Sequence, residues 1–173
     1  MLFADVRGST AIGEKLGPSE YAALLNRFYS TATEVLIRHD AIIDKLIGDE
    51  VMALFIRGIC GPEYHRRAVE AAAALLEAVG YGGSGEPWLA IGGAINSGMT
   101  YVGNVGTEVV DFTALGDTVN TASRMASSAA AGEILLSEGV YAKVGDRFPN
   151  LGKRTLTLRG KEAPMDVRIL GAA

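Results

Sequence analysis

Apolar residues recur along the chain with two different spacings, which predict its helices and strands. Residues 21–36 carry apolar side chains three and four positions apart, which predicts an amphipathic helix ending near His39. Residues 66–79 are alanine-rich with the same period and predict a second helix. Short apolar runs predict strands at 2–6, 41–47, 50–56, 88–96, 99–105, 112–115, 133–136, 155–158 and 167–170, and residues 137–144 predict a short helix.

Turn-forming residues indicate how these segments connect. Gly48–Asp49, between the runs at 41–47 and 50–56, predicts a tight hairpin. The runs at 88–96 and 99–105 are expected to form a second strand pair. The order of strand, helix, hairpin, helix and further strands predicts an α+β fold, with a ferredoxin-like βαββαβ core and additional C-terminal strands and helix.

Polar residues mark the expected helix starts. Residues 7–10 are expected to form a turn that opens a helix directly after the first strand. Ser19 is the expected N-cap of the long helix, and Asp117 with Thr118 is expected to cap a helix that runs to about Ala129.

The composition narrows the class of protein. The chain has 173 residues, of which 49% are hydrophobic and 21% charged, and this predicts a single globular domain over residues 1–173. Because an apolar run begins at once at Leu2, we expect a fragment of a longer chain. The net charge of −4 and the scarcity of Lys/Arg clusters argue against nucleic acid as a partner. We also expect no membrane contact by this domain itself, while attachment of the full-length protein stays open.

Few residues could bind a soft metal. Cys60 is the one cysteine, so an intrachain disulfide is impossible, which favours a reducing, cytoplasmic compartment. With only His39 and His65 beside it, a zinc site is improbable. Any metal is therefore expected to be Mg²⁺ or Mn²⁺ held by carboxylates.

Two aspartates stand out by their position. Asp5 lies at the end of an apolar strand, and Asp49 lies at the tip of an apolar hairpin. A carboxylate beside buried strand residues is costly unless a cation or another partner compensates it, and a divalent cation is one such partner. Read singly, Asp49 could equally be an ordinary turn residue and Asp5 a helix N-cap.

Two further segments suit a nucleotide. The small residues Gly8, Ser9 and Thr10 follow Asp5 and open a helix, so their backbone N–H groups can approach a phosphate. Asn120 and Arg124 are four residues apart and share one helix face, where an amide and a guanidinium can bind a ribose and a phosphate. Alone, either segment could be an ordinary loop or a solvated polar face.

Taken together and in order, these segments resemble one family. The segments 3–10 (FADVRGST), 45–50 (KLIGDE), 103–106 (GNVG) and 115–125 (LGDTVNTASRM) resemble the class III adenylyl/guanylyl cyclase catalytic domain over essentially the whole chain. The resemblance implies closure of a nucleoside triphosphate into its 3′,5′-cyclic monophosphate with two Mg²⁺ or Mn²⁺ ions per active site. It also implies a homodimer whose active sites are shared across the interface.

The resemblance assigns roles residue by residue. It implies that Asp5, the Val6 carbonyl and Asp49 hold the metals, and that Gly8, Ser9 and Thr10 hold the triphosphate. Lys45 and Thr113 would read the base, Asn120 would orient the ribose and Arg124 would stabilise the transferring phosphate. Arg159, with Lys161 as a second cation, would contact the terminal phosphates. Of these, we expect Asp5, Asp49 and Lys45 to come from one chain, and Thr113, Asn120 and Arg124 from the other.

Two positions depart from the family pattern. Thr113 stands where the family often has Asp, and residues 107–110 (TEVV) stand where it often has basic residues. Lys45 only donates hydrogen bonds and so suits adenine N1, and we therefore expect an adenylyl cyclase with ATP as its substrate. The alternatives are a guanylyl cyclase and a catalytically silent, nucleotide-binding regulatory module. A diguanylate cyclase is disfavoured because residues 47–51 (IGDEV) lack that family's hairpin motif.

Overall fold

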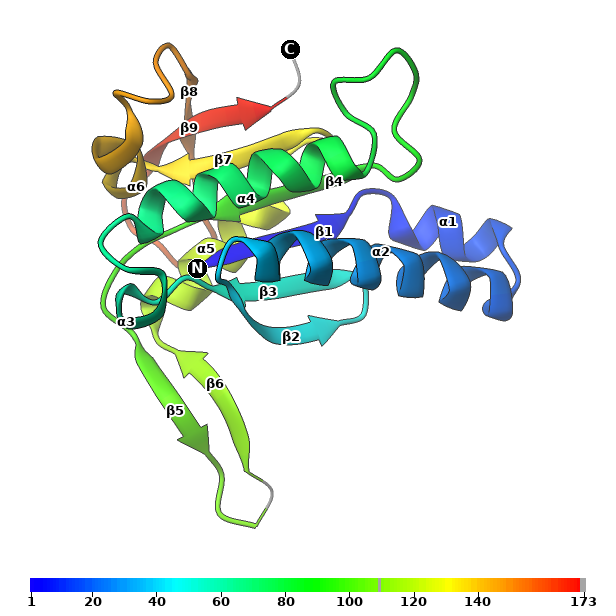
Figure 1. Cartoon of the computed structure of the whole chain (residues 1–173), viewed down its shortest axis with the longest axis horizontal. Coiled ribbons are helices and arrows are strands. Elements are labelled where there is room, and N and C mark those ends of the chain that lie inside the picture. Colours follow the sequence, from blue (N-terminus) through cyan, green and yellow to red (C-terminus); the bar gives the residue numbers. More distant parts are fainter. Residues whose placement is uncertain (109, 172–173) are drawn as a thin grey trace.

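The computed structural model describes residues 1–108 and 110–171, which fold into a mixed sheet covered by helices (Figure 1). The helices are α1 (Ser9–Lys15), α2 (Pro18–Arg38), α3 (Arg57–Cys60), α4 (Tyr64–Ala78), α5 (Asp117–Ser127) and α6 (Glu138–Val144). The strands are β1 (Leu2–Val6), β2 (Ile42–Ile47), β3 (Glu50–Leu54), β4 (Ile91–Ile95), β5 (Tyr101–Val105), β6 (Asp111–Leu115), β7 (Glu133–Ser137), β8 (Gly152–Leu156) and β9 (Met165–Gly171).

The central sheet confirms the predicted fold class. Its strand order is β2-β3-β1-β4-β7-β9-β8. The first four strands pair antiparallel, as a βαββαβ core requires, with β1 between β3 and β4. Strand β7 then adds parallel to β4, and β9 and β8 complete the sheet. The ferredoxin-like core with additional C-terminal strands and helix is therefore present.

The alternation along β1 divides the core into two layers. Leu2, Ala4 and Val6 are buried against the helices on one face, where α2 and α4 lie side by side (Figure 1). Phe3 points to the other face and packs with apolar residues of α5, among them Met125. This alternation places α5 on the face of the sheet opposite to α2 and α4, while the end of β1 lies beside the β2–β3 turn, where the candidate carboxylates lie.

The expected pairing of 88–96 with 99–105 is wrong. Strand β4 already has β1 on one side and β7 on the other, so neither of its edges is free. Strand β5 instead pairs with β6 in a separate two-stranded sheet, which projects away from the central sheet in Figure 1. The strands that occupy the two edges of β4 are distant in sequence, as in the pairs Leu2–Ile95 and Gly93–Ile134, so the apolar runs alone could not reveal them.

Two expected N-caps are also wrong. Helix α2 begins at Pro18 with Gly17 as its N-cap, and the Gly17 N–H donates to Glu20 Oε2 at 3.0 Å. Proline fits the first helical position because its fixed φ is already helical. Helix α5 begins at Asp117, with Gly116 as its N-cap.

None of the helices in the described ranges is both long and apolar enough to cross a membrane.

Candidate active site

The structure places Asp5 and Asp49 next to each other. Asp5 ends β1 and pairs in register with Glu50, the first residue of β3. The Val6 N–H donates to the Asp49 carbonyl at 3.1 Å, which fixes the end of β1 against the β2–β3 turn. Gly48 has a φ of 61°, a left-handed conformation that glycine adopts without strain, so the turn can present Asp49 beside Asp5.

Negative charge is crowded at this corner. Burial raises the pKa of Asp5 to about 6; Arg7 opposes the shift and the charge of Asp49 adds to it. Burial also raises the pKa of Glu50 to about 7, and the charges of Asp5 and Asp49 contribute to that increase. Sequence reasoning missed Glu50, and only the strand register with Asp5 could have revealed it. Burial and like charges disfavour the ionised form of these carboxyl groups, and a nearby cation would stabilise it.

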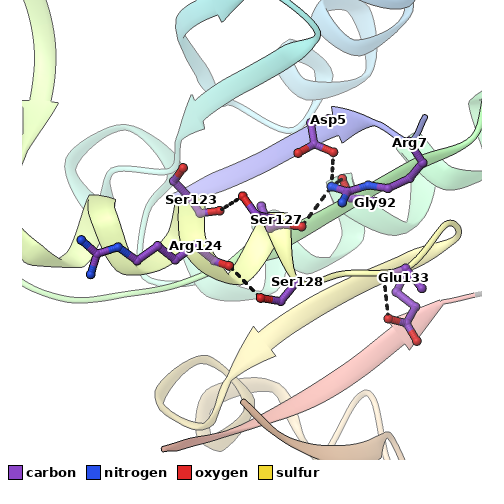
Figure 2. A network of polar contacts seen from close by, with 10 residues as sticks. Asp5, Arg7, Gly92, Ser123, Arg124, Ser127, Ser128 and Glu133 are labelled. Carbon is purple, nitrogen blue, oxygen red and sulfur yellow. Dashed lines mark hydrogen bonds and ion pairs between the residues drawn. The ribbon is translucent and has the colours of Figure 1, made fainter. Parts of the chain in front are cut away.

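Arg7 is the cation that the structure supplies here. Its guanidinium forms an ion pair with Asp5 and donates to the Ala126 carbonyl of α5 at 2.9 Å (Figure 2). The side chain thus joins the end of β1 to α5. Arg7 neutralises part of the charge of Asp5, whereas Asp49 has no ion-pair partner among the described residues.

The donor set fits divalent cations that also bind a substrate. Within residues 1–108 and 110–171, no three His, Cys, Asp or Glu side chains converge into a closed metal cage. Magnesium usually binds through one or two carboxylates and completes its shell with waters and substrate phosphates. Asp5 and Asp49, with the Val6 carbonyl, provide such an open set.

The predicted phosphate loop lies directly after Asp5. Gly8, with a φ of 71°, is the N-cap of α1, and its carbonyl accepts the N–H of Ile12. Ser9 and Thr10 begin the helix, and its first turn carries no acidic residue. Backbone N–H groups at such a helix start are therefore close to the carboxylate pair and free of a competing acidic side chain.

Helix α5 presents Asn120 and Arg124, but away from Asp5. Asn120 is exposed, and the Arg124 side chain extends from α5 on the side away from Asp5 and Arg7 (Figure 2). The Arg124 guanidinium lies beside Gly160, where an added Cβ would be 3.4 Å from Nη1.

The segment around Gly160 brings two more predicted residues to α5. Lys161 forms an ion pair with Asp117 in the first turn of that helix. Arg159 is exposed on the same loop. The cations predicted for the phosphates therefore gather along α5, apart from the carboxylates.

Lys45 and Thr113 lie together within one chain. Lys45 on β2 forms an ion pair with Asp111 on β6, and the Thr113 hydroxyl donates to Asp44 Oδ2 at 2.9 Å. The expectation that Lys45 and Thr113 come from different chains therefore disagrees with the structure. The reason is that β6 lies against β2, which the chain order did not reveal.

A cavity of about 300 Å³ is lined by residues such as Met1, His65 and Asn96, at the opposite end of β1 from Asp5. None of the predicted site residues lines it. The candidate site in one chain thus consists of two open parts, one around Asp5 and Asp49 and one around α5 and β6.

Comparison with known proteins identifies the family. The model of the adenylate and guanylate cyclase catalytic domain matches residues 1–169. Adenylate cyclase 1 of Rhizobium meliloti is 31% identical over 176 residues, which cover 96% of this chain and 26% of that protein.

Solved structures agree in fold. The guanylyl cyclase Cya2 superposes with a TM-score of 0.86 at 29% identity, over 99% of this chain and 91% of that one. The adenylyl cyclase CyaB from P. aeruginosa gives 0.83 at 28% identity, over 99% and 93%. The chain thus spans about a quarter of its curated relative and nearly all of the two solved domains. With the carboxylate pair, the phosphate loop and the polar face of α5 in the expected order, the chain belongs to the class III adenylate and guanylate cyclase catalytic domain family.

Proposed function

We propose that this chain is an adenylyl cyclase domain that converts ATP into 3′,5′-cyclic AMP and pyrophosphate. The observation that carries the proposal is the juxtaposition of Asp5 and Asp49 at the start of the Gly8–Thr10 loop. Carboxylates for cations beside backbone N–H groups for phosphate are what a metal–triphosphate complex needs.

In the proposed reaction the ribose 3′-oxygen bonds to the α-phosphorus, and the bond from that phosphorus to the bridging oxygen of pyrophosphate breaks. Asp5, the Val6 carbonyl and Asp49 would hold two Mg²⁺ or Mn²⁺ ions, which would lower the pKa of the 3′-hydroxyl and neutralise charge on the triphosphate. Gly8, Ser9 and Thr10 hold the β- and γ-phosphates through backbone N–H groups, helped by Arg159 and Lys161.

The second part of the site acts on the sugar and the reacting phosphate. Asn120 orients the ribose so that its 3′-oxygen lies in line with the leaving pyrophosphate. Arg124 donates to the oxygens of the α-phosphoryl group, where negative charge develops.

The proposal includes a homodimer with two shared sites. Arg124 extends from α5 away from Asp5 of the same chain (Figure 2), which favours a site completed by a second chain. Large apolar side chains also stay exposed on β2 and around the β5–β6 hairpin: Leu46, Ile47, Met99, Tyr101, Phe112 and Leu115. A two-fold dimer that buries this surface would place the carboxylates of one chain opposite α5 of its partner.

The contacts of Lys45 lead us to propose a different division of the site residues between the two chains of the dimer. Lys45 neighbours the β6 residue Thr113, and β6 leads directly into α5. We therefore propose that Asp5 and Asp49 come from one chain, and that Lys45, Thr113, Asn120 and Arg124 come from the other.

The preference for ATP is supported by donor chemistry. The Lys45 ammonium only donates, and adenine N1 accepts, whereas guanine N1 carries a hydrogen. The solved neighbours include both a guanylyl and an adenylyl cyclase, which makes a guanylyl cyclase the second candidate.

We also propose that residues 1–173 act as one catalytic domain in the cytoplasm, where its substrate is available.

One assay distinguishes the candidate functions. Purified protein is incubated with Mn²⁺ and either ATP or GTP, and the products are separated by chromatography. The proposal expects cyclic AMP at a higher kcat/KM than cyclic GMP. A higher kcat/KM for GTP would favour the guanylyl cyclase. Nucleotide binding without any cyclic product would instead identify a silent regulatory module.

A further inference from the structure

A β-bulge in β2 lies at the residues that contact β6. Ile43 pairs with Ala53 and Lys45 with Met52, so Asp44 is an extra residue without an opposite partner on β3. In a regular strand, Asp44 and Lys45 would point to opposite faces. The bulge lets both point toward β6, where they contact Thr113 and Asp111.

The bulge gives Thr113 a defined hydrogen-bonding role. Its hydroxyl carries one hydrogen, and that hydrogen is donated to Asp44 Oδ2 at 2.9 Å. An ionised carboxylate only accepts, so this contact can exist only with Thr113 as the donor. Thr113 is 5% exposed, which limits exchange of this partner for water. Toward any third group, the Thr113 hydroxyl can therefore only accept a hydrogen bond, through its lone pairs.

Asp44 itself is not explained by stability alone. Its other oxygen, Oδ1, is buried without a hydrogen-bond partner among the described residues. Leaving a buried acceptor unpaired costs free energy. The hydrogen bond that Asp44 accepts from Thr113 offers a better explanation for a carboxylate at this position.

We propose that Asp44 is a specificity-determining positioning residue that makes Thr113 an obligate hydrogen-bond acceptor toward the substrate base. The inference rests on the proposed function, in which Lys45 and Thr113 read the base. Adenine offers an amine donor at N6, which such an acceptor satisfies. Guanine offers an acceptor at O6, which would face another acceptor. A free threonine hydroxyl would serve both bases, so Asp44 supplies the discrimination that threonine lacks.

The test measures base selection without catalysis. Isothermal titration calorimetry with Mg²⁺ gives the Kd values of 3′-deoxy-ATP and 3′-deoxy-GTP, which lack the attacking hydroxyl. In Asp44→Asn, the side-chain amide can donate to the threonine oxygen and free its hydrogen for guanine O6. The preference for the adenine analogue should fall roughly tenfold, the scale of one hydrogen bond. Asp44→Ala, which also frees the hydroxyl, is the second variant should Asp44→Asn not fold.

Two comparisons separate positioning from a structural effect. In a Thr113→Val background, Asp44→Asn should leave the preference unchanged, because no hydroxyl remains to be oriented. Asp166→Asn is the matched control: Asp166 Oδ1 accepts from the Thr155 hydroxyl at 2.6 Å at the opposite edge of the sheet from β2 and Asp44, and its loss should not alter the preference.

The outcomes distinguish this inference from the proposed function. An unchanged preference in Asp44→Asn, or an equal change in the Thr113→Val background, overturns the role of Asp44 even where the wild type prefers the adenine analogue. A wild type that prefers the guanine analogue contradicts the ATP proposal. In that case a Thr113-dependent shift further toward guanine would still support Asp44.

Discussion

At the scale of single residues, the candidate site is set by an imbalance of charge. Asp5, Asp49 and Glu50 share a half-buried corner in which Arg7 is paired with Asp5. Asp5 and Asp49 were predictable because each interrupts an apolar run. Glu50 and Asp44 were not, because their roles depend on strand register and on a bulge that no local pattern encodes.

Removing one carboxylate should abolish turnover and leave the fold intact. For Asp49→Ala, cyclic AMP production with Mn²⁺ should fall at least roughly 100-fold, the scale of losing one electrostatic contributor to the transition state. Asp146→Ala, at an exposed position in the loop after α6, is the control and should keep normal activity. Near-normal turnover by a folded Asp49→Ala protein would rule out the two-metal assignment.

The raised pKa of Glu50 predicts how stability depends on pH in metal-free buffer. The folded protein holds this proton up to about pH 7, whereas the unfolded chain releases it near its ordinary value of 4.5. Stability is therefore lost as the pH rises between those values. Glu50→Gln removes the penalty, so its Tm should equal that of the wild type near pH 4.5 and exceed it by a few degrees at pH 7.5. A Tm difference that stays constant over this range would contradict the assigned shift.

At the scale of elements, local sequence patterns predicted most helices and strands, but not every contact between them. Strand β1, helix α2 and the β2–β3 hairpin follow from periodicity and from turn residues close in sequence. The β5–β6 pair is itself a local hairpin, but its contact with β2 joins residues more than sixty positions apart, as in the Lys45–Asp111 pair. For this reason the order of segments does not indicate that Lys45 lies beside Thr113.

Exposed apolar residues on the β5–β6 hairpin lead us to predict that this hairpin is part of the dimer interface. Phe112 is 51% exposed on this hairpin, which projects from the central sheet (Figure 1). Phe112→Asp would bury a charge in the proposed interface and should weaken the dimer about tenfold or more, measured by sedimentation velocity. Ile59→Asp changes a similarly exposed residue on α3, at 57%, and should leave the dimer unaffected. Equal effects of both changes would place the interface elsewhere.

At the scale of the whole molecule, one chain carries every predicted group but keeps them in two separate parts. Asp5 and Asp49 lie at the end of β1, and Arg124 points away from them beside Gly160. The order of the motifs predicted both parts and the fold that carries them. The resemblance also leads us to expect these parts in different halves of a shared site, whereas the place of Lys45 beside Thr113 could not be predicted because it depends on the contact of β6 with β2.

The most direct test of the account is complementation between two inactive variants. Asp49→Ala and Arg124→Ala should each be nearly inactive as homodimers, because every site lacks one essential group. A heterodimer of the two has one site without both groups and one intact site. Co-expressed chains with different affinity tags, purified through both, should therefore make cyclic AMP at about half the wild-type rate. Heterodimers that form but show no recovered activity would contradict the shared active site.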